Sequence, residues 1–372
     1  MRPFFEQDNL SLYCGDLREV LPTLPEASVD FVVTDPPYGL SFMEKDWDHE
    51  VPGPEYWQAI VRVCKPGAMM LAFGGTRTYH RLTCAIEDAG WEIRDALMWL
   101  YGQGMPKCGD IGKLIDKAKG AKREVVGTKL GRPGYSLANH GRTNEVYGDL
   151  HNPDAECAIT APATPEAAKW TGWAMALKPA WEPIVLAMKP MDGTIAHNAL
   201  AWGVAGMNVE ASRIGTERTV RTRGDSLTDA GWASTNRSPV GGSECGRWPA
   251  NLLFDDKAAR LLDVQTATLK SGSTVDDAQA SYGETRGASR FFYCSKAAKR
   301  ERGPGNDHPT VKPLVLIEYL LTLLSTPDGG VILDPFAGSG TTLLAAKRLG
   351  RRSIGVELTE HNCEIAKSRL SI

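Results

Sequence analysis

The sequence contains little that would mark a metal-binding, secreted or membrane protein. Its 372 residues include eight cysteines, but no CxxC pair and no cysteine–histidine cluster with the spacing of metal ligands. No apolar run is long enough to span a bilayer, and the N-terminal MRPFFEQDNL lacks the apolar core of a signal peptide. We therefore expect reduced thiols, no bound metal, no membrane contact and a cytoplasmic location.

An excess of positive charge, which would point directly to a nucleic-acid partner, is also missing. The formal net charge is −3, although a local basic surface is enough to bind a phosphate backbone. Hydrophobic residues make up 42% and charged residues 23% of the chain, which is the composition of a globular protein. The length fits one large α/β domain with insertions or two ordinary domains.

The two ends of the chain have the pattern of a parallel sheet. Residues 28–34 (SVDFVVT) form a short apolar run that stops at Asp35, as a buried strand does. Further strands are predicted over 68–73, 91–100, 182–188, 331–333 and 353–356, and helices over 55–64, 76–89, 315–324, 341–349 and 360–370. This alternation of strands and helices predicts a doubly wound α/β fold.

The middle of the chain, 102–305, is richer in Gly, Ser, Thr and Asn and has few long periodic segments. Two basic stretches lie in it. The first contains Lys117, Lys119, Lys122 and Arg123, and the second contains Arg218, Arg221 and Arg223. A run of charge usually forms a solvated surface, so each stretch taken alone is as consistent with that reading as with a phosphate contact.

A glycine-rich loop, DPFAGSGTT, stands between a predicted strand and a predicted helix near the C-terminus. Its Gly338 and Gly340 allow the backbone to approach a ligand at a helix N-terminus. Glu357 ends the next predicted strand, where an acid can accept hydrogen bonds from a ribose diol. Leu343 replaces the third glycine of a dinucleotide fingerprint, which favours a smaller nucleoside. A tight turn without a ligand is the alternative interpretation.

A proline-rich quartet, Asp35-Pro36-Pro37-Tyr38, follows the first predicted strand. Two prolines keep the loop out of a helix, so its carbonyls and the Asp35 carboxylate can be held outward as acceptors. Tyr38 adds an aromatic face that can stack on a planar base. Acceptors for an exocyclic amine beside a stacking ring suit an extruded nucleobase. A stiffened surface turn is the alternative.

Together the two motifs resemble those of the DNA amino-methyltransferases, which use S-adenosylmethionine to methylate adenine N6 or cytosine N4. DPPY looks like the catalytic motif of that family, and DPFAGSGTT looks like its cofactor loop. Because DPPY comes first and a long segment separates the two, the order resembles the β group of the family. Asp16 resembles the residue that meets the cofactor adenine, and the segment 308–313 (HPTVKP) resembles the one that lines the methionine end of the cofactor.

The resemblance also implies roles for individual residues. Asp35 and the Pro36 carbonyl would accept hydrogen bonds from the target amine, and Tyr38 would stack on the flipped base. The implied catalytic residues are Asp35, Pro36, Pro37 and Tyr38, and the implied cofactor-binding residues are Asp16, His308, Lys312, Asp334, Phe336, Gly338, Gly340, Thr341, Thr342 and Glu357. The cofactor would be S-adenosylmethionine without a metal, and the substrate would be double-stranded DNA. Phosphate contacts then become the favoured role of the two basic stretches, and a homodimer is compatible with the family.

The same resemblance implies a Rossmann-like methyltransferase core with a mainly parallel seven-stranded sheet, built from both ends of the chain. Strands 91–100 and 182–188 would pair to supply its antiparallel edge. The implied organisation is a catalytic half over 1–101, an insertion near DNA over 102–180, a core strand over 181–195, a target-recognition region over 196–305 and a cofactor-binding half over 306–372.

Asp35 also bears on the choice of base, because cytosine-N4 enzymes of the family more often carry serine at this position. The resemblance therefore favours site-specific methylation of adenine N6 in DNA, in a bacterial or phage-infected cell. Three alternatives stay open: a cytosine-N4 DNA methyltransferase, an RNA or protein methyltransferase, and a DNA-binding relative that has lost catalysis.

Overall fold

The computed structural model describes residues 1–40, 49–102, 109–130, 156–215, 219–222, 239–243, 246–266, 288–295 and 311–371. The chain divides into two compact units, one made of Met1–Gln103 with Ala180–Ile372 and the other of Gly104–Pro179. Within these described ranges, no helix combines the length and the apolar character needed to cross a membrane. Three predicted site residues, His308, Arg218 and Arg223, lie outside the described residues.

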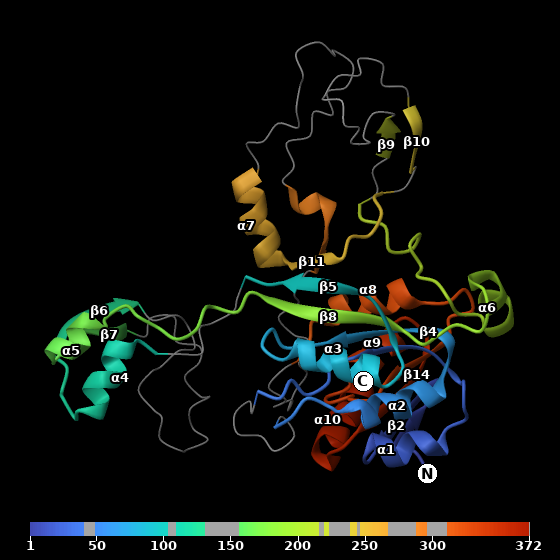
Figure 1. Ribbon diagram of the computed structural model, residues 1–372, viewed down its shortest axis with the longest axis horizontal. Coiled ribbons are helices and arrows are strands. Elements are labelled where there is room, and N and C mark those ends of the chain that lie inside the picture. Colours follow the sequence, from blue (N-terminus) through green and yellow to red (C-terminus); the bar gives the residue numbers. More distant parts are fainter. Residues whose placement is uncertain are drawn as a thin grey trace. The chain divides into compact units, whose positions relative to one another are not determined.

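A sheet of ten strands, counted over the described residues, organises the larger unit (Figure 1). In spatial order the strands are β1 (Phe5–Gln7), β2 (Leu10–Cys14), β14 (Arg352–Glu357), β13 (Val331–Asp334), β3 (Val29–Thr34), β4 (Cys64–Phe73), β8 (Trp181–Met188), β5 (Glu92–Leu100), β11 (Leu252–Asp255) and β12 (Tyr293–Ser295). All neighbours pair in parallel except at β1–β2 and on both sides of β8. The predicted α/β class with a mainly parallel sheet is confirmed.

The reversed strand β8 lies inside the sheet. It runs antiparallel to both β4 and β5, which confirms the predicted pairing of 91–100 with 182–188. The expectation that this pair forms the edge of the sheet is wrong, because β11 and β12 continue the sheet beyond β5. Leu253 and Phe254 of β11 are buried there. The seven strands from β2 to β5 are the core that the prediction describes, and three further strands extend it.

Helices accompany the strands of the larger unit. They are α1 (Leu17–Val20), α2 (Pro54–Val63), α3 (Tyr79–Asp88), α6 (Ile195–Trp202), α7 (Asp256–Thr266), α8 (Leu314–Leu324), α9 (Thr341–Arg348) and α10 (Glu360–Leu370), with 3-10 turns at Leu21–Thr23 and Ala288–Phe291. The five predicted helices correspond to α2, α3, α8, α9 and α10. A separate ribbon pairs β9 (Thr219–Thr222) with β10 (Pro239–Ser243).

Two apolar clusters form on opposite faces of the sheet because the central strand β3 is apolar on both. All six residues of β3 are buried. Val32 belongs to the cluster that contains Trp57 of α2, whereas Phe31 belongs to the cluster that contains Leu320 of α8. Successive side chains of a strand point to opposite faces, so α2 and α8 cover different sides of the sheet. Because helices cover both faces of the sheet, a ligand can reach it at the ends of the strands.

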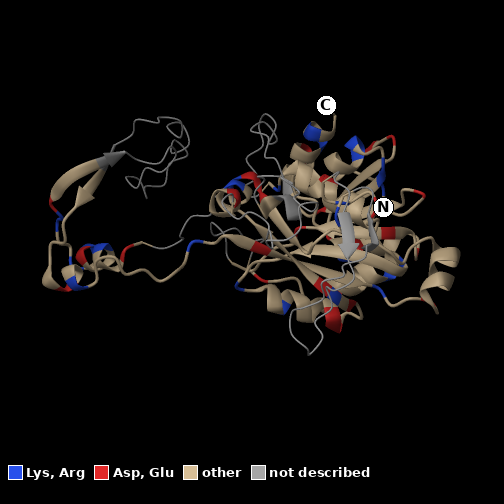
Figure 2. Ribbon diagram, turned by 90° about the horizontal axis from the view of Figure 1, so that it is seen from above, with Lys and Arg blue, Asp and Glu red and all other residues tan. Residues whose placement is uncertain are grey.

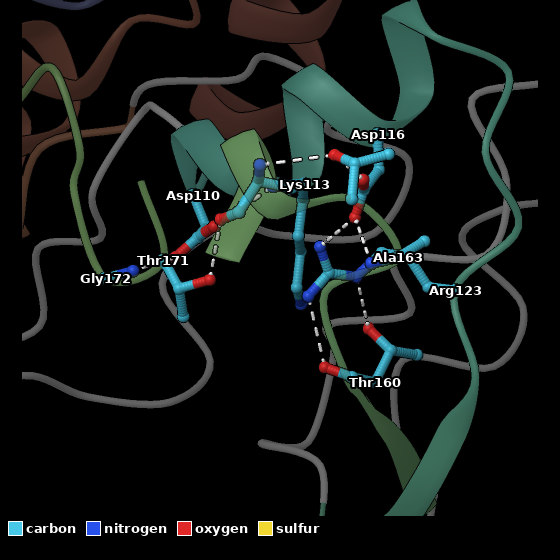
Figure 3. A network of polar contacts seen from close by, with 10 residues as sticks. Asp110, Lys113, Asp116, Arg123, Thr160, Ala163, Thr171 and Gly172 are labelled. Atoms are coloured by element: carbon cyan, nitrogen blue, oxygen red, sulfur yellow. Dashed lines mark hydrogen bonds and ion pairs between the residues drawn. The ribbon is translucent and has the colours of Figure 1, made fainter. Parts of the chain in front are cut away.

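The smaller unit is described in two parts of the chain. It contains α4 (Ile111–Ala118), β6 (Val125–Leu130), β7 (Glu156–Thr160) and α5 (Pro165–Lys169), with β6 and β7 antiparallel. Its centre is the buried carboxylate of Asp116, which accepts hydrogen bonds from Arg123 Nη1 at 2.6 Å and from the Ala163 amide at 3.0 Å (Figure 3). Arg123 also donates to Thr160. This network joins α4 to the end of β7.

Candidate active site

The two sequence motifs meet at one edge of the sheet. Strands β3 and β13 are parallel neighbours, so the residues that follow them leave the sheet at the same edge. The Thr34 hydroxyl at the end of β3 donates to Asp334 Oδ1 at the end of β13, over 2.7 Å, although the two residues are 300 positions apart. DPPY and DPFAGSGTT therefore begin side by side, as their combined use in one site requires.

Asp35 lies in a hydrogen-bonded group of four side chains that we call the Asp35 cluster: Asp35, Tyr38, Glu182 and Lys312. The Lys312 ammonium is 2.6 Å from Asp35 Oδ2, 3.1 Å from the Tyr38 hydroxyl and 3.4 Å from Glu182 Oε2. The Tyr38 hydroxyl is 2.8 Å from Asp35 Oδ1 and 3.2 Å from Glu182 Oε2. The cluster joins the loop after β3, strand β8 and the segment that leads into α8.

Burial and charge set the protonation of Lys312 and Tyr38 in this cluster. Burial disfavours the charged form of Lys312, but the facing carboxylates of Asp35 and Glu182 outweigh it and raise the pKa of the lysine. Burial and the same two carboxylates raise the pKa of Tyr38 well above its ordinary value. At neutral pH Lys312 is therefore a cation and Tyr38 a phenol that can donate a hydrogen bond.

The glycine loop has the backbone that only glycine adopts readily. Gly338 and Gly340 have φ angles of 52° and 77°, in the left-handed region. A Cβ added to Gly340 would lie 3.0 Å from the Cβ of Ala366 in α10, so a side chain would also push the loop away from that helix. The Gly338 amide donates to Glu357 Oε2 at 2.9 Å. The loop is thus tied to the acid that ends β14.

Arg369 of α10 forms hydrogen bonds with this loop. Arg369 is 5% exposed, and its Nη1 donates to the Ser339 carbonyl at 2.5 Å, to Ser339 Oγ at 3.0 Å and to Thr341 Oγ1 at 3.1 Å. Sequence reasoning missed this residue, because an arginine in a C-terminal helix with charged neighbours carries no signal of burial.

The two predicted nucleoside-binding acids lie next to each other. Asp16 follows β2 and Glu357 ends β14, and these strands are parallel neighbours. The Gly15 amide donates to the Glu357 carbonyl at 2.9 Å. Glu357 Oε1 accepts from Thr359 and Asn362, and among the described residues Oε2 accepts from the Gly338 amide. Asp16 is bound by Arg18, whose hydrogen bonds lower the pKa of the Asp16 carboxyl.

The chemistry of this edge fits a nucleoside without phosphate groups. Asp16 and Glu357 are both carboxylates, which accept hydrogen bonds from hydroxyl and amine groups and repel phosphate. Two further predicted residues, Phe336 and Asp334, lie at the start of the glycine loop. Phe336 packs against the rings of Tyr56 and Trp57, at centroid distances of 6.3 and 6.0 Å. Asp334 is buried, and burial raises its pKa to about 6.

One residue predicted to bind the cofactor also belongs to the Asp35 cluster. Lys312, predicted at the methionine end of a cofactor, has its ammonium in the Asp35 cluster. Glu182, the acid of that cluster, was missed because it appeared in the sequence as the first residue of a strand rather than as part of a motif.

The four predicted basic residues of the smaller unit fall into two groups. Arg123 is bonded to Asp116, and Lys119 forms an ion pair of 2.5 Å with Glu166. Lys117 and Lys122 are exposed. Figure 2 shows Lys and Arg interspersed with Asp and Glu in the helical part of this unit. Arg221 lies in β9, where the backbone alone is described. A DNA contact by any of these residues stays a prediction.

The mainly parallel sheet defines an α/β protein, and the glycine loop, its two neighbouring acids and the loop that bears Asp35 lie at one edge of that sheet. Comparison with known proteins identifies the family: a family model for N6/N4 enzymes, described as DNA methylase, matches residues 29–115 and 166–368. The chain belongs to this family. That finding confirms the resemblance drawn from DPPY and DPFAGSGTT.

Individual relatives match over different lengths. The type II methyltransferase M2.DpnII of Streptococcus pneumoniae is 50% identical over 76 residues, which are 20% of this chain and 28% of that protein. The type II methyltransferase M.HindIII of Haemophilus influenzae is 25% identical over 312 residues, 84% of this chain and 65% of that protein. Among solved structures, the PvuII DNA methyltransferase (cytosine-N4-specific) aligns over 99% of this chain and 88% of its own, with 15% identity and a TM-score of 0.49. The chain spans less than two thirds of the length of both curated relatives.

Proposed function

We propose that the protein is a site-specific DNA methyltransferase that transfers a methyl group from S-adenosylmethionine to N6 of an adenine flipped out of double-stranded DNA. The observation that carries this proposal is the hydrogen bond from Thr34 to Asp334, which ties the loop that bears Asp35 to the glycine loop. An acceptor for an amine and a nucleoside site thereby share one edge of the sheet. Membership of the DNA methylase family supports the proposal.

The residues of the nucleoside site would hold the cofactor. Glu357 would accept the ribose hydroxyls through Oε2, Asp16 would meet the adenine, and the backbone of 338–342 would follow the methionine portion. Bound S-adenosylmethionine would supply an electrophilic methyl group whose sulfur leaves with the electron pair of the carbon–sulfur bond, and the methylated nitrogen would lose one proton to solvent.

Asp35 and the Pro36 carbonyl would orient the target amine. The lone pair of an exocyclic amine is delocalised into the base, so acceptors for its two N–H groups favour a tetrahedral nitrogen and aim the lone pair out of the ring plane. Each Asp35 oxygen has one described partner, Tyr38 or Lys312, and keeps lone-pair capacity for another donor. Asp35 can therefore accept the amine without breaking the cluster. The ring of Tyr38 would stack on the flipped base.

We assign DNA contact to the middle of the chain, with target recognition in 196–305 and an insertion near the duplex over 102–180. Within the described part of that insertion, the exposed Lys117 and Lys122 are the candidates for phosphate contacts. A homodimer and a cytoplasmic location in a bacterial or phage-infected cell remain predictions.

Transfer of a radiolabelled methyl group tests this proposal. We expect label from S-adenosylmethionine to enter unmethylated genomic DNA, and an excess of RNA or of unrelated protein not to compete for it. Label in RNA or protein but not in DNA would overturn the substrate class. Cofactor binding without transfer to any of the three would indicate a relative that has lost catalysis.

A further inference from the structure

The role proposed above for Asp35 leaves Glu182 without a task, although this acid lies in the same cluster. Glu182 belongs to β8, where its backbone pairs with Trp99 of β5. Its side chain is 22% exposed and reaches both Lys312 and Tyr38. Burying part of a carboxylate costs solvation free energy, and the contacts with Lys312 and Tyr38 offset that cost.

The three donors of the Lys312 ammonium explain why a second acid is present. An ammonium has three N–H groups and no acceptor. Those of Lys312 face Asp35 at 2.6 Å, the Tyr38 hydroxyl at 3.1 Å and Glu182 at 3.4 Å, and the lysine side chain is 10% exposed. Three partners for three donors fix the ammonium in one orientation. Without Glu182, one donor in a nearly buried place would lose its partner.

Tyr38 links the two acids. Its hydroxyl lies 2.8 Å from Asp35 and 3.2 Å from Glu182, and its oxygen faces the Lys312 ammonium. Asp35 therefore receives one donor on each carboxylate oxygen, and both donors also contact Glu182. Glu182 has no described contact with Asp35 itself, so any effect on Asp35 passes through Lys312 and Tyr38.

We propose that Glu182 is a positioning residue for methyl transfer: by holding Lys312 and Tyr38, it keeps the Asp35 carboxylate in the orientation that receives the target amine. This inference rests on the proposed function. It assigns to Glu182 an effect on the rate of transfer and none on the affinity for the cofactor, because its described partners lie on the Asp35 side of the site.

The charge of the cluster supports the same role. Two carboxylates and one ammonium leave a net charge of −1 beside the nitrogen on which positive charge develops during transfer, and a fixed negative charge at that place stabilises the transition state. The ionisable groups described around Lys312 are Asp35 and Tyr38 from the loop after β3, Glu182 from β8, and Tyr101 after β5. Replacing Glu182 by glutamine would make the cluster neutral.

Glu182→Gln is the test, with Glu318→Gln as the matched control. Glu318 of α8 is 23% exposed and forms an ion pair of 3.1 Å with Arg348, so the control removes an equally exposed glutamate charge elsewhere. Under single-turnover conditions with saturating cofactor and DNA, we expect Glu182→Gln to slow transfer roughly 10- to 100-fold. We expect the dissociation constant for S-adenosylmethionine, measured by calorimetry, to stay within about twofold, the change that a residue outside the cofactor site produces. Glu318→Gln should change neither quantity.

Two further variants keep the inference falsifiable if Glu182→Gln is unstable. Glu182→Asp keeps the charge on a shorter side chain and should recover part of the lost rate. In a Lys312→Met background, Glu182→Gln should cost less rate than it does in the wild type, because residues that act as one unit are not additive.

Three results would overturn the inference: wild-type transfer by Glu182→Gln, a loss confined to cofactor affinity, or full additivity with Lys312→Met. All three presuppose that the wild-type protein methylates DNA. If it does not, the proposed function fails first, and the inference fails with it.

Discussion

Replacing Asp35 by alanine tests the chemistry of the site most sharply. In the proposed mechanism, the variant loses the acceptor for the target amine and a carboxylate beside the developing positive charge. A single preorganised group of this kind is worth about 10²- to 10³-fold in rate, or roughly 3–4 kcal/mol, and we expect at least that loss in single-turnover transfer. The affinity for S-adenosylmethionine should stay nearly unchanged, because Asp16 and Glu357 lie at the ends of other strands.

The same variant has a limited effect on stability. Removing one partner of a buried ion pair costs about 3–5 kcal/mol, but Asp35 is 25% exposed and Lys312 keeps Glu182 and Tyr38 as partners. We therefore expect a loss of roughly 1–2 kcal/mol in the free energy of unfolding, measured with urea. Asp35→Asn keeps an acceptor and should retain more stability. Transfer at the wild-type rate by the folded Asp35→Ala protein would refute the assignment of the catalytic loop.

Three further predictions concern the glycine loop, the buried acid beside it and the smaller unit. Gly340→Ala should weaken S-adenosylmethionine binding because its Cβ would meet Ala366. Gly350 has a similar φ of 65° but open space around it, so Gly350→Ala should leave binding unchanged. Equal affinities of the two variants in a calorimetric titration would contradict this prediction. Burial raises the pKa of Asp334 to about 6 from 3.8, so its contribution to stability is complete below about pH 4 and is lost as the pH rises through 6. Asp334→Asn should therefore lose less stability than the wild type between pH 4 and pH 7, as urea midpoints would show. Asp116→Ala removes the acceptor for Arg123 and Ala163, so amide hydrogen exchange should become faster in α4 and stay slow in the core sheet. Unchanged exchange in α4 would refute the structural role of that carboxylate.

The elements that the sequence predicted are those whose pattern comes from burial on both faces or from a stop signal. Strand β3 was evident because VDFVVT is mostly apolar and β-branched and ends at a proline-rich loop. Strand β2 was missed although Asp16, just after it, was selected, because LSLYC is too short to show a clear alternation. Strand β11 was missed for the same reason, and it is the strand that moves the sheet edge away from β5.

The candidate site was predicted as far as its residues belong to motifs. DPPY and DPFAGSGTT have a local order that chemistry explains, and their meeting at one edge follows from parallel strands. Glu182 and Arg369 could not be found in that way. Their roles depend on contacts between segments far apart in the chain, Glu182 with Lys312 and Arg369 with the glycine loop, and no local pattern records such a contact.

The identity of the methylated nucleoside tests the central claim most directly. Unmethylated genomic DNA would be incubated with the protein and S-adenosylmethionine, digested to nucleosides and analysed by mass spectrometry, with the Asp35→Ala variant as the control. We predict N6-methyladenine with the wild type and none with the variant. N4-methylcytosine would keep the fold and the mechanism but contradict the choice of base. The absence of any methylated base, from a protein that binds S-adenosylmethionine, would contradict the proposal that it is a DNA methyltransferase.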